Sequence, residues 1–154
     1  MQYPGYTRGA ILLTEGNSYV FKIHNLIQLQ DNEYYYVLID VNGLKHFLTA
    51  KYYKNYKFSS GDDIICRVDK INCTGRIYLE PVHPYYKEDT IYLFDLEIYE
   101  NRAEEQSIIV TDIYGNKIPI TSIETEKQGL IMKKRVKCRI KNIKKGVPEL
   151  EIVL

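Results

Sequence analysis

The sequence predicts an all-β protein that contains one small barrel motif twice in tandem. Three observations support this prediction: an internal repeat, short runs of strand-forming residues separated by turn signals, and a candidate helix at the same place in each copy. The chain has 154 residues, of which 45% are hydrophobic and 27% charged. That is enough for one medium domain or two small ones, so the repeat decides between them.

The repeat consists of three blocks that recur in the same order. The block EGNSYVFKI, which begins at Glu15, returns as EDTIYLFDL at Glu88, a shift of 73 residues. The blocks IDVNGLK and ICRVDKIN return as TDIYGNK and KCRIKNIK, both at a shift of 72. We therefore expect an N-terminal extension over 1–14, a first barrel over 15–86 and a second, divergent barrel over 87–154.

The two copies also share a pattern of strands and turns. Residues rich in β-propensity are bounded by Gly, Asn, Asp and Ser, which is typical of short antiparallel strands. A short helix is expected between the third and fourth strand of each copy, at 50–58 and 123–129. Such a five-stranded Greek-key barrel with an insertion after strand three is the OB pattern. The predicted strands are 18–28, 34–41, 44–49, 63–72 and 76–80, and then 91–99, 106–112, 117–120, 134–143 and 149–153.

Alternation along the fourth strand of each copy predicts which side chains form the core. Apolar residues recur at every second position, and Cys66 and Cys138 lie in these apolar series. We therefore expect both cysteines to be core residues rather than ligands or nucleophiles. The three cysteines of the chain form no CxxC pair, so neither a zinc site nor a disulfide framework is expected. No cofactor is expected either.

The charge distribution is more informative than the net charge of +1. Acidic residues dominate from 87 to 126 and basic residues from 127 to 154, where Lys137 and Arg139 occupy one strand. Such a strand provides either a local anion-binding patch or a solvated sheet edge. The start of the chain resembles no signal peptide and no apolar run is long enough to span a membrane, so a cytoplasmic protein is expected.

Several segments of the first copy resemble the S1 type of OB domain, an RNA-binding module. Gly43-Leu44-Lys45-His46 is similar to the Gly-Leu-Val-His stretch on the third strand of that family. Gly61-Asp62-Asp63-Ile64 and the following CRVDKINCTGRIYLEP are similar to its fourth strand, turn and fifth strand. In that family a polar residue at the turn precedes an arginine by four positions, and here these residues are Asn72 and Arg76.

The resemblance implies a nucleic-acid-binding face on the first copy. Tyr34 and Tyr36 match the second-strand aromatics, and His46 matches the third-strand histidine. At a shift of 72, His46 aligns with Ile118 and would face the core, whereas at 71 it aligns with Lys117 and would face solvent. The resemblance favours the exposed orientation. The second copy has aliphatic residues, lysine or proline at the matching positions and lacks this face.

We therefore predict a non-catalytic protein that binds single-stranded RNA, or nucleic acid generally. Aromatic rings would stack on bases while nearby cations bind phosphates. A protein-interaction or adaptor module is the alternative, because OB barrels have many functions. An enzyme is not expected, since no catalytic motif is present. The predicted binding residues are Tyr34, Tyr36, His46, Asn72 and Arg76, extended by Lys51 and Lys54 and by Lys137 and Arg139 of the second copy.

Overall fold

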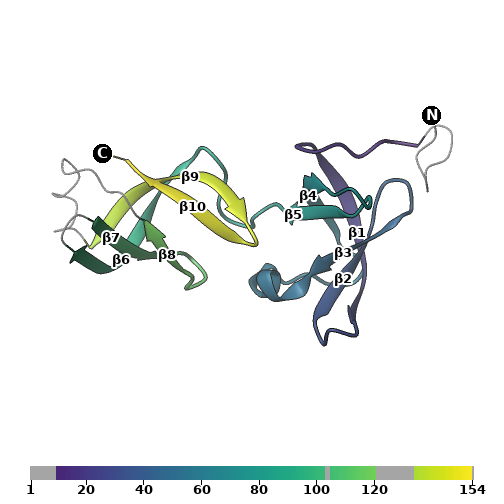
Figure 1. Cartoon of the computed structure of the whole chain (residues 1–154), viewed down its shortest axis with the longest axis horizontal. Coiled ribbons are helices and arrows are strands. Elements are labelled where there is room, and N and C mark those ends of the chain that lie inside the picture. The colour runs from purple at the N-terminus through teal and green to yellow at the C-terminus, as the bar shows by residue number, and fades with distance from the viewer. Residues whose placement is uncertain (1–9, 103–104, 121–133, 154) are drawn as a thin grey trace. The chain divides into compact units, whose positions relative to one another are not determined.

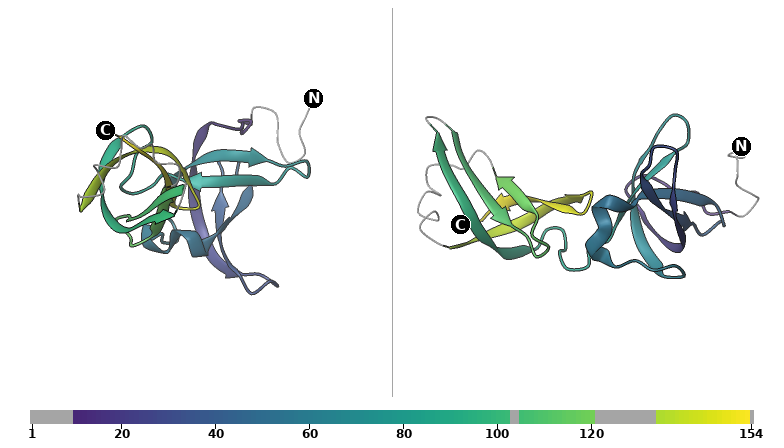
Figure 2. Two further views of the ribbon diagram at one scale, coloured as in Figure 1. Left: turned by 60° about the vertical axis from the view of Figure 1, so that its left-hand side comes forward. Right: turned by 90° about the horizontal axis from the view of Figure 1, so that it is seen from below.

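The chain divides into two compact units, Met1–Pro84 and Tyr85–Leu154. The computed structural model (Figure 1) describes residues 10–102, 105–120 and 134–153. Each unit is built on one five-stranded antiparallel sheet, and Figure 2 shows that each sheet curves round on itself.

The sheet of the first unit has the strand order β3-β2-β1-β4-β5. Its edge strands β3 and β5 come into contact, which closes the sheet toward a barrel. A short 3-10 helix, η1, follows β3 and separates it from β4. The elements are β1 (Ser18–Gln28), β2 (Tyr34–Ile39), β3 (Lys45–Thr49), η1 (Ala50–Tyr56), β4 (Asp63–Ile71) and β5 (Ile77–Pro81).

The sheet of the second unit repeats this topology. Its order is β10-β9-β6-β7-β8, and the edge strands β8 and β10 come into contact. The first strand of each unit carries a bulge at matching positions, between Ile23 and Asn25 and between Leu96 and Ile98. The elements are β6 (Ile91–Arg102), β7 (Glu105–Thr111), β8 (Lys117–Ile120), β9 (Arg135–Lys144) and β10 (Val147–Ile152).

The predicted fold class is confirmed: the chain is all-β, with two tandem five-stranded barrels of OB type. The observed strands match the predicted ranges to within a few residues at their ends. The helix expected at 50–58 is present as η1. The helix expected at 123–129 and the first nine residues of the expected N-terminal extension lie outside the described residues.

Each unit has its own apolar core. Phe21 and Leu38 are fully buried in the first unit, and Phe94 and Val110 in the second. Fully burying a large apolar side chain of this kind contributes about 1.5–3 kcal/mol to folding. The fourth strands alternate as predicted, so that both matched cysteines are buried in these cores. Burial raises the pKa of the Cys66 thiol, and that of Cys138 to about 12, so both remain protonated packing residues.

The repeat extends a few residues upstream of the blocks found in the sequence. Thr14 N donates to the Tyr19 hydroxyl at 3.0 Å, and Lys87 N donates to the Tyr92 hydroxyl at 2.9 Å. Both hydroxyls also lie 3.4 Å from a backbone carbonyl oxygen at equivalent places, that of Leu12 and that of Tyr85. The structural repeat therefore includes Leu12 in the first unit and Tyr85 in the second.

Among the described residues, no helix has the length and apolar character needed to cross a membrane.

Candidate functional site

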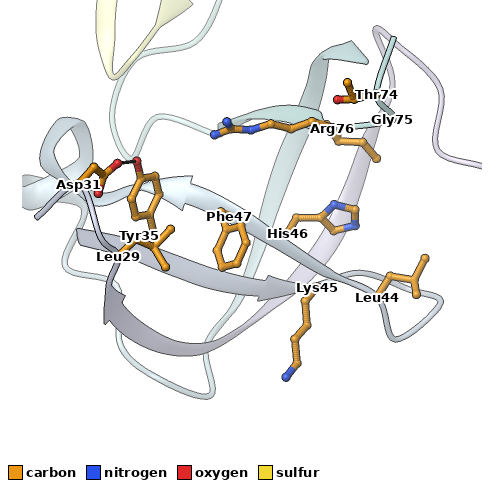
Figure 3. A pocket seen from close by; sticks show the side chains of 11 residues that line it. Leu29, Asp31, Tyr35, Leu44, Lys45, His46, Phe47, Thr74, Gly75 and Arg76 are labelled. Atoms are coloured by element: carbon orange, nitrogen blue, oxygen red, sulfur yellow. Dashed lines mark hydrogen bonds between the residues drawn. The ribbon is translucent and has the colours of Figure 1, made fainter. Parts of the chain in front are cut away.

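An open cavity of ≈ 680 Å³ lies on one face of the first unit (Figure 3). Its lining comes from the β1–β2 loop, from β2 and β3, and from the β4–β5 hairpin. In OB folds, the face of strands 2 and 3 together with these two loops is where oligonucleotides and oligosaccharides bind. The lining residues are Leu29, Asp31, Tyr35, Leu44, Lys45, His46, Phe47, Thr74, Gly75, Arg76 and Ile77.

Two aromatic rings form the floor of this cavity. Phe47 pairs with Val37 across the β2–β3 ladder, and Tyr35 lies two residues from Val37, so both rings share one face of the sheet. The ring centroids are 6.2 Å apart and nearly perpendicular. Phe47 remains 44% exposed although it is large and apolar. A well-exposed ring on a rigid sheet is suited to stacking on a flat ligand.

The Tyr35 ring is held in place by an acidic residue of the β1–β2 loop. The Tyr35 hydroxyl donates a hydrogen bond to Asp31 Oδ2 at 2.7 Å. This bond raises the pKa of Tyr35 and lowers the pKa of Asp31, so both stay in their donor and acceptor forms around neutral pH. Fixing the ring before a ligand arrives reduces the entropy lost on binding.

The cation of the cavity is Arg76, which the β4–β5 hairpin carries. Asn72 Oδ1 accepts hydrogen bonds from Thr74 N at 3.1 Å and from Arg76 N at 2.8 Å, which shapes the turn. Gly75, with φ of +84°, takes the left-handed position of this turn. Arg76 is exposed, its guanidinium lies 4.9 Å from the centroid of the Tyr78 ring, and it makes no salt bridge with any described residue. Asn72 thus acts on the site by positioning Arg76.

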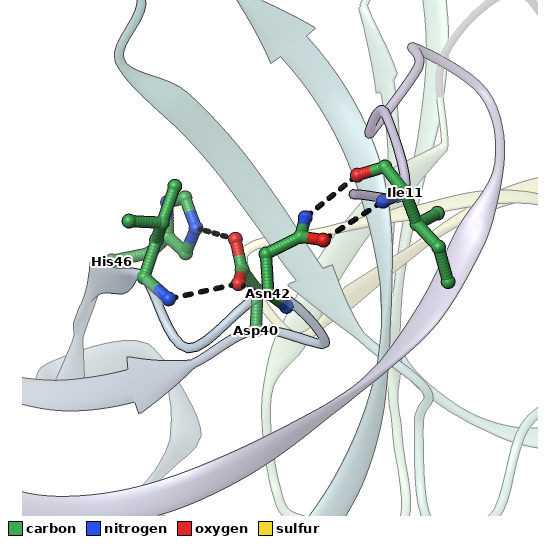
Figure 4. Close-up of polar contacts among 5 residues, drawn as sticks. Ile11, Asp40, Asn42 and His46 are labelled. Atoms are coloured by element: carbon green, nitrogen blue, oxygen red, sulfur yellow. Dashed lines mark hydrogen bonds and ion pairs between the residues drawn. The ribbon is translucent and has the colours of Figure 1, made fainter. Parts of the chain in front are cut away.

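His46 does not have the exposed orientation expected from the sequence. Its side chain is only 12% exposed, and Nε2 lies 2.7 Å from Oδ2 of the buried Asp40 (Figure 4). The edge of the imidazole also meets the Phe21 ring in the core, at 5.9 Å between centroids. The shift of 72 aligns His46 with the buried Ile118, and this alignment gives the correct orientation of the His46 side chain. His46 still lines the cavity, and it contacts Asp40, the residue that accepts the backbone hydrogen bonds of the β2–β3 turn.

The two tyrosines predicted to stack on bases lie outside the cavity lining. Tyr34 is 51% exposed but stands at the first position of β2. Tyr36 is half-buried, with its ring 5.5 Å from that of Phe58. The tyrosine between them, Tyr35, is the one that lines the cavity. Consecutive residues of a strand point to opposite faces, so the three tyrosines cannot all contribute.

The predicted lysines of η1 also lie outside the cavity lining. Lys51 Nζ is 3.6 Å from Glu33 Oε1 and 5.2 Å from the centroid of the Tyr52 ring. Lys54 is exposed in the last turn of η1. Two tyrosines of this segment, Tyr53 and Tyr56, are buried, which accounts for part of the tyrosine-rich run as packing.

The predicted cations of the second unit lie on β9, where acids partly neutralise them. Arg139 lies 3.7 Å from Glu151 of β10. Lys137 is exposed and has no salt bridge to a described residue. The neighbouring basic residues of β9 pair across the sheet in the same way, Arg135 with Asp95 at 3.2 Å and Lys141 with Glu149 at 3.9 Å.

Of the residues that line the cavity, only His46 and Arg76 were predicted from the sequence. The missed residues on which the chemistry of the site depends are Asp31, Tyr35, Lys45 and Phe47. The signal for three of them was the alignment of His46 with Ile118. An inward His46 turns its strand neighbours Lys45 and Phe47 to the outer face, and the β2–β3 ladder then adds Tyr35. Asp31 belongs to a loop, where periodicity provides no signal.

Within the described ranges, no three His, Cys, Asp or Glu side chains gather in a way that would hold a metal ion. The cavity contains one carboxylate, Asp31, and one partly buried imidazole, His46, which form hydrogen bonds with Tyr35 and Asp40 respectively. The cavity also presents two aromatic rings and two exposed cations, Lys45 and Arg76.

No protein-family model matches the chain, and no curated protein matches it either. Among solved structures, the chain is similar to ModG, described as a cytoplasmic molybdate-binding protein and solved with molybdate bound. The two share 12% sequence identity over 82% of this chain and 89% of that one, with a TM-score of 0.28. Likeness at this level carries no inference about a ligand.

Proposed function

We propose that the first unit is a non-catalytic, S1-like module that binds single-stranded RNA at the cavity of β2, β3 and the β4–β5 hairpin. The observation that carries this proposal is the aromatic pair of the half-buried Tyr35 and the exposed Phe47, beside Arg76, which makes no salt bridge with a described residue. The pair lies on the face that OB folds use for oligonucleotides. Each stacked base is worth about 1–3 kcal/mol. Arg76 and Lys45 supply the positive charge for the phosphates.

The first test compares two exposed aromatic residues of the same strand pair. Phe47→Ala removes a ring from the cavity, whereas Tyr34→Ala removes a ring of β2 that does not line it. Titration of a fluorescent single-stranded RNA hexamer at low salt should show Phe47→Ala weakening binding about tenfold or more, as expected for one lost stacking contact. Tyr34→Ala should change the affinity less than about twofold.

The same titration gives a second readout through its salt dependence. Each phosphate neutralised on a single strand contributes about −0.7 to the slope of log affinity against log salt. Arg76→Gln should therefore make the slope shallower by about 0.7, while Phe47→Ala leaves it unchanged. If the wild-type protein fails to bind the hexamer at low salt, the proposal is wrong.

A second candidate function is protein interaction through exposed apolar side chains on and beside β1 and β4. Val20 and Ile65, paired across β1 and β4, are 49% and 50% exposed, and Val82, whose N donates to the Ile65 carbonyl, is 59% exposed. In the second unit, Lys137 stands at the position that matches Ile65. A partner that is retained after nuclease treatment and lost in Ile65→Lys would favour this function over nucleic-acid binding.

A further inference from the structure

The cavity contains one carboxylate among its aromatic and cationic groups. Asp31 Oδ2 accepts the hydrogen bond of the Tyr35 hydroxyl at 2.7 Å, and Oδ1 accepts that of Glu33 N at 2.9 Å. A carboxylate oxygen has two acceptor positions, so each oxygen keeps one for a ligand. Asp31 is exposed and makes no salt bridge with any described residue. It is therefore a fixed and accessible acceptor.

Asp31 lies at the hydroxyl end of the Tyr35 ring, as Figure 3 shows. A base that stacks on this ring and extends past its hydroxyl brings its polar edge to the carboxylate. A phosphate is repelled from the same place, because both groups are negatively charged. In Figure 3 the guanidinium of Arg76, whose charge acts on Tyr35, lies across the Tyr35 hydroxyl from Asp31, and it attracts the phosphate instead. The charges thus orient a nucleotide, with its base edge toward Asp31.

The four RNA bases differ in what they offer to a carboxylate. Cytosine, adenine and guanine each carry an exocyclic amino group, which donates hydrogen bonds. Uracil has only a ring N–H between two carbonyl oxygens, and these oxygens repel a negative acceptor. A carboxylate that a bound base shields from water, without donating a hydrogen bond to it, loses hydration and gains no bond in exchange. Cytosine and uracil are the sharpest comparison, because both are pyrimidines of the same size.

We propose that Asp31 makes the cavity select amino-bearing bases, cytosine among them, over uracil. This inference rests on the proposed RNA binding and adds base selection to it. Tyr35 and Phe47 would bind any base by stacking, Arg76 and Lys45 would bind any phosphate, and Asp31 would be the specificity-determining residue of the site.

The experiment titrates fluorescent cytidine and uridine ribohexamers with the full chain at one salt concentration. The wild type should bind the cytidine hexamer at least about fivefold more tightly, in the range of one discriminating hydrogen bond to a charged group. Asp31→Asn keeps an oxygen for Glu33 N but offers both a donor and an acceptor to the base, so the ratio should fall below about twofold. Asp63→Asn, at an exposed acid paired with Lys22 outside the cavity, is the matched control and should keep the wild-type ratio.

The outcomes separate the two proposals. Equal affinity of the wild type for both hexamers, or an unchanged ratio in Asp31→Asn, overturns base selection and leaves RNA binding in place. Failure to bind either hexamer overturns RNA binding itself. The wild-type ratio does not depend on how well a variant folds, and circular dichroism of Asp31→Asn shows whether its ratio belongs to a folded protein.

Discussion

At the scale of single residues, one aspartate shapes the same turn in both units. Oδ1 of Asp40 accepts hydrogen bonds from Asn42 N and Leu44 N, and Oδ1 of Asp112 accepts those of Tyr114 N and Asn116 N. The second carboxylate oxygen differs between the units. It meets His46 Nε2 at 2.7 Å in the first unit and Asn116 Nδ2 at 2.8 Å in the second. Both turns use the carboxylate in the same way, whereas the side chain that contacts its second oxygen can be either histidine or asparagine.

Because Asp40 is buried and accepts several hydrogen bonds, its loss leaves donors without partners. We expect Asp40→Ala to lower the free energy of unfolding by about 2 kcal/mol or more. Asp63→Ala, which removes an exposed ion pair with Lys22, should cost less than about 1 kcal/mol. Urea unfolding followed by circular dichroism measures both, and equal losses would contradict the role assigned to Asp40.

The resemblance to S1 domains predicted part of the site. It pointed to Asn72 and Arg76 because of their places around a turn, and the shape of a turn depends mainly on local backbone geometry. Tyr35 was missed because three consecutive tyrosines show no alternation, and because both faces of β2 accept an aromatic ring. The choice among them depends on the pairing of β2 with its neighbours, and hence on contacts distant in the sequence.

At the scale of elements, the β2–β3 turn and its counterpart between β7 and β8 each contain a glycine in the left-handed backbone conformation. The glycine is needed for this conformation and not because a side chain would clash. Gly43 and Gly115 have φ of +82° and +81°, and a Cβ added at either would meet no atom within 4 Å. The left-handed conformation costs a residue with a Cβ about 1–2 kcal/mol. The glycine in each sequence therefore predicted the turn correctly, because the backbone requirement is local.

Gly43→Ala should lower the free energy of unfolding by about 1 kcal/mol, because alanine is strained at this φ. Gly43→Asn should cost less, since asparagine tolerates the left-handed region better than alanine. Chemical denaturation of the two variants distinguishes backbone strain from packing: if crowding by a side chain were the cause, the larger asparagine would be the more destabilising.

At the scale of the whole molecule, the cavity and the cores belong to separate units. All cavity residues lie within 29–77, inside the first unit. The buried cluster around Phe94 and Cys138 draws only on residues of the second unit, from Tyr86 to Ile152. Each unit therefore has what an independently folding domain needs, a closed sheet and a core of its own.

We expect a fragment of residues 1–84 to fold alone and to bind the RNA hexamer within about threefold of the full chain, since single charges outside a site add little at moderate salt. A fragment of residues 85–154 should fold but bind at least about tenfold more weakly. Amide NMR spectra report folding and anisotropy reports affinity. Stronger binding by the second fragment would show that the binding site lies in the second unit, contrary to the proposal.

The sequence by itself determined the all-β class, the duplication, the order of strands, the core cysteines and the turns. These features follow from periodicity, from local backbone demands and from similarity between the two copies. Only the tertiary structure decided that His46 turns inward to Asp40, that Tyr35 rather than Tyr34 or Tyr36 shares a face with Phe47, and that Asp31 meets Tyr35. Each of these depends on how strands pair and where a loop comes to rest, and such contacts leave no periodic signal along the chain.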